Sequence, residues 1–161
     1  MYDRARAPHR IVRRAVATVP VAWLSARVLH RLDRVVHRVT RRRATLSAWA
    51  SGLPVVMLTT RGARTGQERE VPVVALPDGD QLVLIASNFG QRHHPAWYHN
   101  LRAHPQAVVD GREYEARELT GEERERQFQY GVQIYPGWLR YRERAANREI
   151  PVIRLTPLEA R

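Results

Sequence analysis

The chain of 161 residues is long enough for a single domain with one hydrophobic core that needs no metal or disulfide to hold it together. It has no cysteine and all 27 basic residues are arginine, which excludes disulfides, thiolate metal sites, cysteine nucleophiles, lysine Schiff bases and the P-loop. The charge is uneven, because residues 1–50 hold twelve arginines against two aspartates, whereas residues 51–161 hold fifteen arginines against fourteen acids. A nucleic-acid-binding surface over the whole domain is therefore not expected.

Residues 21–50 predict an amphipathic helix with a Val/Leu face and an arginine face. The apolar positions recur at three, four or seven residues, from Val21 to Leu46, and arginines from Arg27 to Arg41 fall opposite. Such a helix suits the anionic surface of a membrane, which residues 21–43 would contact. The alternatives are an ordinary surface helix whose arginine face is solvated and an arm that binds nucleic acid, of which the nucleic-acid role is not expected. Because no run of about 18 apolar residues and no secretory pattern occurs, we expect a cytoplasmic protein, peripheral at the inner face of the cell membrane.

Six short segments after residue 50 predict β-strands, because they are apolar or alternating and rich in β-branched residues. They are Leu53–Thr60, Glu70–Leu76, Gln81–Ala86, Ala107–Asp110, Glu113–Leu119 and Ile150–Leu155. Turn-forming sequences separate neighbours at Gly62–Gly66, Pro77–Asp80 and Asp110-Gly111. We therefore expect mostly antiparallel strands that close into a barrel.

Two helices are expected to interrupt the strands. The first covers Pro95–His104 with proline in its first turn. The second runs from Thr120 to about Ala146, opened by a capping box of Thr120 and Glu123 and broken or kinked at Pro136-Gly137. The fold class is α+β with a β core, in which residues 51–161 form one domain after a helical arm of residues 1–50.

The turn after the first strand is dense in arginine and contains two glycines. Guanidinium groups, exposed amides and a threonine hydroxyl suit an anionic ligand. The turn does not open a helix and has no lysine, so it is neither a Walker loop nor a dinucleotide fingerprint. An ordinary hairpin with solvated arginines is the alternative that composition alone leaves open. The candidate residues are Arg61, Arg64, Thr65, Gly66 and Arg69.

The loop that follows the third strand offers a hydroxyl, an amide and an aromatic ring in Ser87-Asn88-Phe89, a place where loops often line a ligand cleft. In the helix after it, Trp97 and Leu101 are four residues apart, which favours packing on the barrel. Histidines in this region, such as His94 and His99, are five residues apart, which places them on different faces of a helix. No carboxylate or cysteine completes a metal site with them, so no metal is expected.

An aromatic stripe follows the second helix. Tyr135, Trp138 and Tyr141 share a three-residue spacing that gathers them on one side, close to the break at Pro136-Gly137. Such stripes are usually core, but tyrosine hydroxyls also suit a flat polar substrate. Both interpretations stay open on the residues alone.

Several linked motifs resemble the deazaflavin-dependent nitroreductase family. They are Leu58-Thr59-Thr60-x-Gly62-x-Arg64-Thr65-Gly66-x-x-Arg69, then Ala86-Ser87, then Pro95-x-Trp97-Tyr98-x-Asn100-Leu101-x-Ala103-x-Pro105, then Tyr135-Pro136 and Ile150-Pro151-Val152. The resemblance covers about residues 45–157 and implies a split β-barrel that binds coenzyme F-420, an 8-hydroxy-5-deazaflavin with a phosphate and an oligoglutamate tail. It further implies hydride transfer from the reduced cofactor to a quinone-like, nitroaromatic or other conjugated acceptor.

The resemblance also assigns roles to the candidate residues. The arginine turn would hold the phosphate and tail, Ala86, Ser87, Asn88 and Trp97 would contact the cofactor, and Ser87, Tyr135, Trp138 and Tyr141 would face the acceptor. An FMN-binding split-barrel reductase and a non-catalytic, membrane-associated deazaflavin carrier are the alternatives. Some relatives carry an N-terminal helix associated with membranes, which favours the membrane interpretation of residues 21–43. We expect a monomer or weak dimer.

Overall fold

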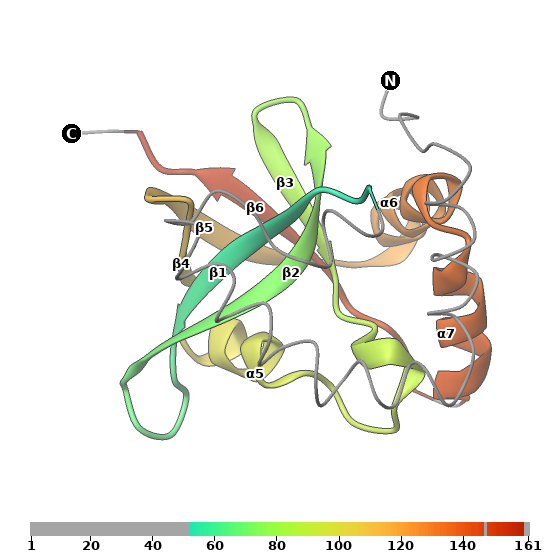
Figure 1. The fold of residues 1–161 in the computed structure, drawn as a ribbon, viewed down its shortest axis with the longest axis horizontal. Helices are drawn as coiled ribbons and strands as arrows, with labels where there is room; N and C mark the ends of the chain where they lie inside the picture. Colours follow the sequence, from blue (N-terminus) through green and yellow to red (C-terminus); the bar gives the residue numbers. More distant parts are fainter. Residues whose placement is uncertain (1–51, 147, 160–161) are drawn as a thin grey trace.

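The computed structural model describes residues 52–146 and 148–159, in which six strands form a closed barrel (Figure 1). The strands are β1 (Val55–Arg61), β2 (Glu68–Asp78), β3 (Gln81–Ile85), β4 (Gln106–Val109), β5 (Arg112–Leu119) and β6 (Val152–Pro157). The helices are the 3-10 helix η2 (Asn88–Gly90), α5 (Ala96–Ala103), α6 (Gly121–Ile134) and α7 (Gly137–Ala145). The expected helical arm of residues 1–50 lies outside the described residues.

All neighbouring strands are antiparallel, in the order β1-β2-β3-β6-β5-β4, and β4 pairs back onto β1. This confirms the expected α+β split barrel. In Figure 1, α6 and α7 cover one side of the barrel, while α5 lies across its lower end. Helix α5 therefore covers one apolar surface of the barrel, and α6 and α7 together cover another.

The core has two parts because β3 and β6 are buried on both faces. Leu84 and Ile153 point into the barrel, where α5 contributes Trp97, Tyr98 and Leu101. Alternate residues such as Val83 and Val152 point outward, to a second cluster under α6 and α7. A strand buried on both faces is expected to be a continuous apolar run, as in Leu82–Ile85.

Two local details differ from the sequence expectation. The second strand continues to Asp78, which pairs with Gln81, so the turn is formed by Gly79 and Asp80 alone. Thr120 is at the N-cap of α6, but its side chain makes no capping hydrogen bond, so the expected capping box is wrong. Its expected partner Glu123 instead forms ion pairs with Arg117 and Arg154, because charged donors compete successfully for a carboxylate.

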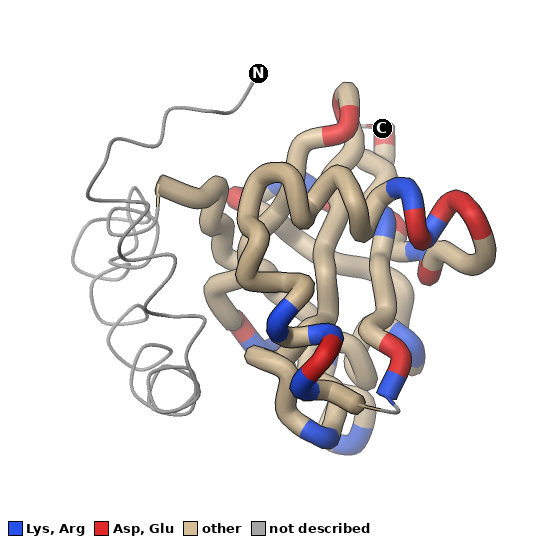
Figure 2. The backbone as a smooth tube through the Cα atoms, turned by 90° about the vertical axis from the view of Figure 1, so that its right-hand side faces the viewer, with Lys and Arg blue, Asp and Glu red and all other residues tan. Residues whose placement is uncertain are grey.

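Charges on the described domain are mixed in sign. Seen from the α7 side in Figure 2, basic and acidic segments of the domain are interspersed. Among the described residues, ion pairs with carboxylates are formed by Arg117, Arg124, Arg126, Arg142 and Arg154. Among the described helices, none combines the length and apolar character needed to cross a membrane.

Candidate active site

The arginine turn connects β1 to β2 and is shaped by its two glycines. The amide of Gly62 donates to the carbonyl of Gln67 and the amide of Gly66 donates to the carbonyl of Gly62, both at 2.8 Å. Gly66 has φ +67°, a conformation that side chains disfavour, and a Cβ on Gly62 would lie 3.0 Å from Thr65 Oγ1 and 3.1 Å from the Gln67 carbonyl. Glycine is therefore favoured at both positions, by the close contacts at Gly62 and by the left-handed backbone at Gly66.

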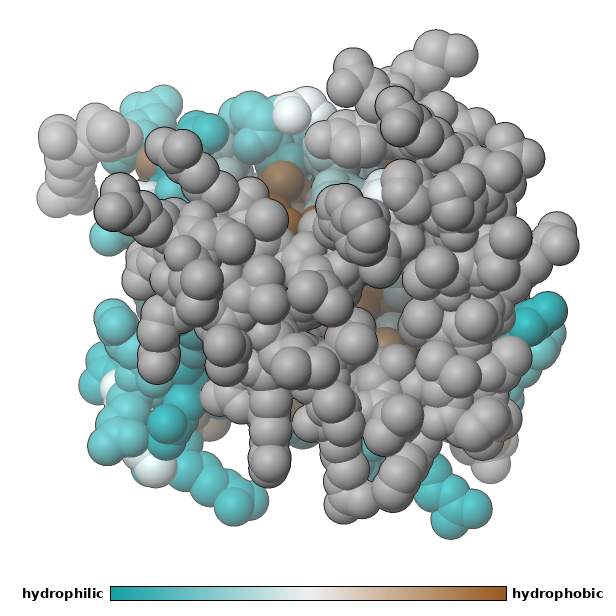
Figure 3. Space-filling model, in the orientation of Figure 1, coloured by the Kyte–Doolittle hydropathy of each residue, from teal (hydrophilic) through white to brown (hydrophobic). Residues whose placement is uncertain are grey.

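The side chains of the turn face solvent. Arg61, Arg64, Thr65, Gly66 and Arg69 are all exposed. In Figure 3, hydrophilic residues gather at the lower left, where Figure 1 places this turn. Within the described residues, none of its three arginines forms an ion pair, in contrast to the arginines around α6. The guanidinium groups are thus available to an anionic ligand.

A buried asparagine ties the turn to α5. Asn100 Oδ1 accepts a hydrogen bond from the Ala63 amide, and Asn100 Nδ2 donates to Thr60 Oγ1, each at 3.0 Å. Asn100 is 9% exposed and Thr60 is 2% exposed, so the Thr60 bond lies in the interior. Sequence reasoning placed Asn100 in a family motif but gave it no role. Because 40 residues separate Asn100 from Thr60, no short sequence pattern indicates this hydrogen bond.

The loop after β3 forms the second part of the site. Ser87 precedes η2 but its hydroxyl makes no capping hydrogen bond, while the Asn88 carboxamide donates to the His93 carbonyl at 3.0 Å. The backbone is left-handed at three consecutive residues, with φ 48° at Asn88, 56° at Phe89 and 77° at Gly90. Left-handed backbone is costly for residues with a side chain, so this loop needs contacts that hold it.

The third part is the corner between α6 and α7. Tyr135 Oη and Tyr141 Oη are 2.9 Å apart, and the Tyr135 ring is edge-on to Trp138 with centroids 5.5 Å apart. The predicted gathering of these three residues is confirmed, and all are buried in the outer hydrophobic cluster. Gly137 is required here, since a Cβ would lie 2.2 Å from Tyr135 Cζ.

The chemistry of this corner follows from its burial. Burial raises the pKa of Tyr141, with a further contribution from the adjacent Tyr135, so the phenol stays protonated. It can therefore donate a hydrogen bond at any ordinary pH. The ring of Phe89 contacts Tyr141 edge-on at 5.9 Å, which joins this corner to the loop after β3.

The structure thus brings the loop after β3 next to the tyrosine pair through Phe89, and it separately ties the arginine turn to α5 through Asn100. In Figure 1 the turn, α5 and η2 all lie at the lower part of the molecule. Trp97 is part of the barrel core, as its spacing predicted. Tyr130 packs against the same outer cluster, and its hydroxyl donates to the Pro77 carbonyl at 3.2 Å.

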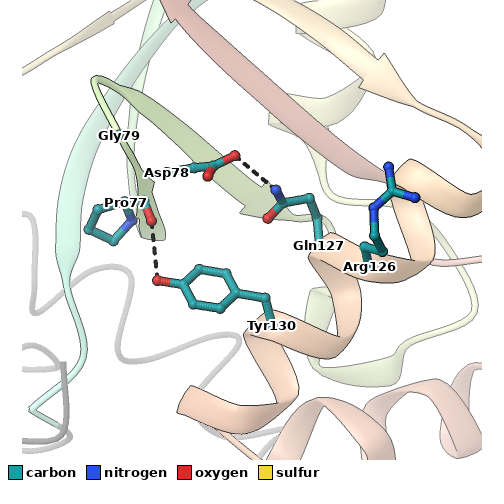
Figure 4. Close-up of a pocket in the computed structure, with 6 residues that line it drawn as sticks. All are labelled: Pro77, Asp78, Gly79, Arg126, Gln127 and Tyr130. Atoms are coloured by element: carbon teal, nitrogen blue, oxygen red, sulfur yellow. Dashed lines mark hydrogen bonds between the residues drawn. The ribbon is translucent and has the colours of Figure 1, made fainter. Parts of the chain in front are cut away.

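A pocket elsewhere does not belong to this site. It has a volume of about 430 Å³ and lies between the β2–β3 hairpin and α6, lined by Pro77, Asp78, Gly79, Arg126, Gln127 and Tyr130 (Figure 4). Two of its polar contacts are internal, namely the 2.8 Å bond from Gln127 Nε2 to Asp78 Oδ2 and the 3.2 Å bond from Tyr130 Oη to the Pro77 carbonyl. It contains none of the candidate residues. Among the described residues, no cluster of metal-binding side chains occurs either.

A six-stranded antiparallel barrel with a glycine and arginine turn at one end and a buried tyrosine pair under α6 and α7 defines a small split-barrel domain whose turn suits an anionic cofactor. A model of the F420H(2)-dependent quinone reductase family matches residues 31–157, so the chain belongs to this family. The match confirms the resemblance that the sequence motifs indicated.

Individual relatives agree with the family. An F420H(2)-dependent quinone reductase of Mycobacterium tuberculosis is 39% identical over 57 residues, which cover 35% of this chain and 38% of that protein. The matched segment thus spans well under half the length of that relative. A putative F420H(2)-dependent quinone reductase of the same species is 28% identical over 109 residues, which cover 65% of this chain and 91% of that protein.

Solved structures support the same fold. The structure of an F420-H2 dependent reductase has a TM-score of 0.58 and 35% identity, and the match covers 64% of this chain and 94% of the other. A structure described as a domain-swapped dimer has a TM-score of 0.61 and 30% identity, covering 86% of this chain and 100% of the other.

Proposed function

We propose that the protein is an oxidoreductase that transfers hydride from reduced coenzyme F-420 to a quinone or another conjugated, electron-poor acceptor such as a nitroaromatic. The observation that carries the proposal is the turn with three exposed arginines, which Asn100 of α5 anchors to the barrel. The names of the family and of its relatives support both the cofactor and the acceptor class.

The donors of the turn fit the anionic part of the cofactor. Arg61, Arg64 and Arg69 present forked N–H donors, which match phosphate and carboxylate oxygens, and Thr65 adds a hydroxyl. The absence of a side chain at Gly66 lets a ligand approach the backbone. We assign the phosphate and oligoglutamate tail to this turn, and the contacts to the ring system to Ala86, Ser87, Asn88 and Trp97.

When bound, the reduced deazaflavin supplies the hydride. The chain's own task is to orient the acceptor and to stabilise the negative charge that grows on its oxygen. Ser87, Tyr135 and Tyr141 can donate hydrogen bonds to that oxygen. Burial raises the pKa of Tyr141, so its hydroxyl is protonated and able to donate a hydrogen bond.

The burial of the tyrosines sets a condition on this mechanism. Tyr135 is 5% exposed and Tyr141 is 3% exposed, so an acceptor reaches their hydroxyls only when the α6–α7 corner opens. Trp138, which packs on Tyr135, would then form one wall of the acceptor site. A flat quinone suits a space between aromatic rings, because stacking favours it.

We also propose that residues 21–43 bind an anionic membrane surface from the cytoplasmic side, where a membrane quinone would be met. The support is the alternation of apolar and arginine faces in the sequence. Co-sedimentation with anionic and with zwitterionic vesicles tests this. Binding to anionic vesicles that is lost at high salt is expected, whereas equal recovery in the supernatant with both vesicles would contradict it.

The reaction itself is tested by following the oxidation of reduced F-420 anaerobically, with and without a soluble naphthoquinone. Oxidation that requires both protein and quinone is expected. Tight F-420 binding without turnover would favour the non-catalytic carrier, and a preference for FMN would favour a flavin-dependent relative of the same fold.

A further inference from the structure

Arg148, which lies between α7 and β6, contacts the loop after β3 through its whole guanidinium group. Nη2 donates to the Ser87 carbonyl at 2.7 Å, Nε donates to the Gln91 carbonyl at 3.0 Å, and Nη1 lies 3.5 Å from the Ala86 carbonyl. These three carbonyls enclose the left-handed residues 88–90 from both sides. One side chain thus closes the loop across more than 50 residues of sequence.

A second arginine adds to this closure at the centre of the loop. Arg144 Nη1 donates to the Phe89 carbonyl at 3.1 Å, and the Arg144 guanidinium lies 5.4 Å from the centre of the Tyr141 ring. The strained backbone of residues 88–90 is therefore held by charge-assisted hydrogen bonds from α7 and the residues after it.

The remaining contact of Arg148 is titratable. Arg148 Nη1 is 2.9 Å from His94 Nδ1. Burial lowers the pKa of Arg148, but a guanidinium remains a protonated donor in proteins. His94 Nδ1 must therefore accept this hydrogen bond, which requires a neutral ring with its proton on Nε2.

We infer that Arg148 is a positioning residue that holds the Ala86–Gln91 loop, and with it the Ser87 hydroxyl, in one conformation, and that it does so only while the His94 ring is neutral. Protonation of Nδ1 replaces an acceptor by a donor and places two cations within hydrogen-bonding distance. Arg148 then turns away, and of the two arginines only Arg144 still holds the left-handed loop, through the Phe89 carbonyl. The role of Ser87 towards an acceptor rests on the proposed function, whereas the closure of the loop does not.

The surroundings of His94 favour the neutral ring. Burial lowers the pKa of His94 below its ordinary value of 6.5, Arg148, His99 and Arg102 lower it further, and Glu118 alone opposes them. The hydrogen-bond partner of the Glu118 carboxylate is the Tyr98 hydroxyl, which donates to it at 3.1 Å. The loop should accordingly stay closed at neutral pH and open below pH 6.5.

Hydrogen exchange in the cofactor-free protein tests the inference without any turnover. The amides of Gly90 and Gln91 donate within the loop, to the carbonyls of Ser87 and Asn88. Arg148→Met should raise their exchange roughly tenfold or more at neutral pH, as expected for loss of hydrogen bonds to a charged group. Arg140→Met, which changes an exposed arginine of α7, is the matched control and should leave the loop unchanged.

The pH dependence of the loop tests whether His94 acts through its protonation or only as a structural contact. In the wild type, the protection of the loop amides, after correction for the slower intrinsic exchange in acid, should decrease as the pH falls below 6.5, and kcat with a quinone should fall more than KM rises. His94→Gln keeps an acceptor for Arg148 but does not titrate, so it should abolish both changes, whereas His93→Gln, which replaces the histidine whose Nδ1 lies 3.1 Å from Asn88 Nδ2, should preserve them. Arg148→Lys should restore only part of the closure, because one ammonium does not reach all the carbonyls.

Two results would overturn the inference. One is unchanged loop exchange in Arg148→Met, and the other is an acid response that persists in His94→Gln. If the wild type shows no F-420-dependent turnover at all, the proposed function fails, while the exchange measurements still decide whether Arg148 and His94 close the loop.

Discussion

Replacing Asn100 tests whether α5 holds the arginine turn in shape. Asn100→Leu keeps the side-chain size but removes the acceptor for the Ala63 amide and the donor to Thr60 Oγ1. The lost Ala63 bond costs about 1 kcal/mol, and the Thr60 hydroxyl, left buried without its partner, costs about 1–3 kcal/mol. The free energy of unfolding should therefore fall by about 2–4 kcal/mol, which corresponds to a Tm lower by roughly 6–12 °C.

The same substitution should weaken cofactor binding, because the turn must be ordered again before it binds. We expect F-420 affinity to fall about tenfold, equivalent to about 1.4 kcal/mol, in a fluorescence titration at a temperature where both proteins are folded. Asn100→Asp is the matched control. Its carboxylate still accepts from the Ala63 amide, and the Thr60 hydroxyl can rotate to donate, so the Tm should fall less; its negative charge beside the turn should itself weaken F-420 binding, so this control applies to the Tm alone.

The two measurements separate structure from binding. If Asn100→Leu unfolds at the wild-type temperature, the two hydrogen bonds do not support the turn as described. If the Tm falls but F-420 affinity is unchanged, Asn100 stabilises the barrel without shaping a binding turn.

Three further predictions concern charge, hydroxyl groups and pH. Arg64→Ala should weaken F-420 binding about tenfold or more and reduce its salt dependence, whereas Arg126→Ala, which removes the same charge from α6, should not; equal effects would point to net charge alone. Tyr135→Phe should lower kcat about tenfold with little change in F-420 affinity, and an unchanged kcat would remove this hydroxyl from the reaction. The hydrogen bond from Gln129, followed by that from an arginine of α7, lowers the pKa of Glu125 below 4.5. Because the folded-state pKa is lowered, the ionised carboxylate stabilises the fold, fully above pH 4.5 and progressively less as the pH falls below it. In thermal unfolding, the Tm of Glu125→Gln should therefore decrease less on acidification than the Tm of the wild type.

The fold was predictable from sequence because its strands and turns carry local signals. The apolar run Leu82–Ile85 and the hairpin at Asp110-Gly111 each follow from residue type. The ends of the strands were less predictable where tertiary contacts determine them. Pro77-Asp78 have the composition of a turn, but they pair with Leu82 and Gln81 because the barrel extends the ladder.

The candidate site was predictable only where its residues are close in sequence. The spacing of Tyr135, Trp138 and Tyr141 indicated that they gather, and their ring contacts confirm it. Asn100 and Arg148 were missed as site residues, because their partners lie about 40 and 60 residues away. A side chain that supports a backbone turn or loop from another element leaves no pattern in one sequence.

The central claim is that the barrel and its arginine turn form a site for coenzyme F-420, and fluorescence titration of the full chain tests it most directly, with FMN in parallel. Saturable F-420 binding at micromolar or lower concentration, weaker binding of FMN, and loss of affinity in Arg64→Ala are predicted. No saturable F-420 binding, or tighter binding of FMN, would contradict the assignment while leaving the fold as described.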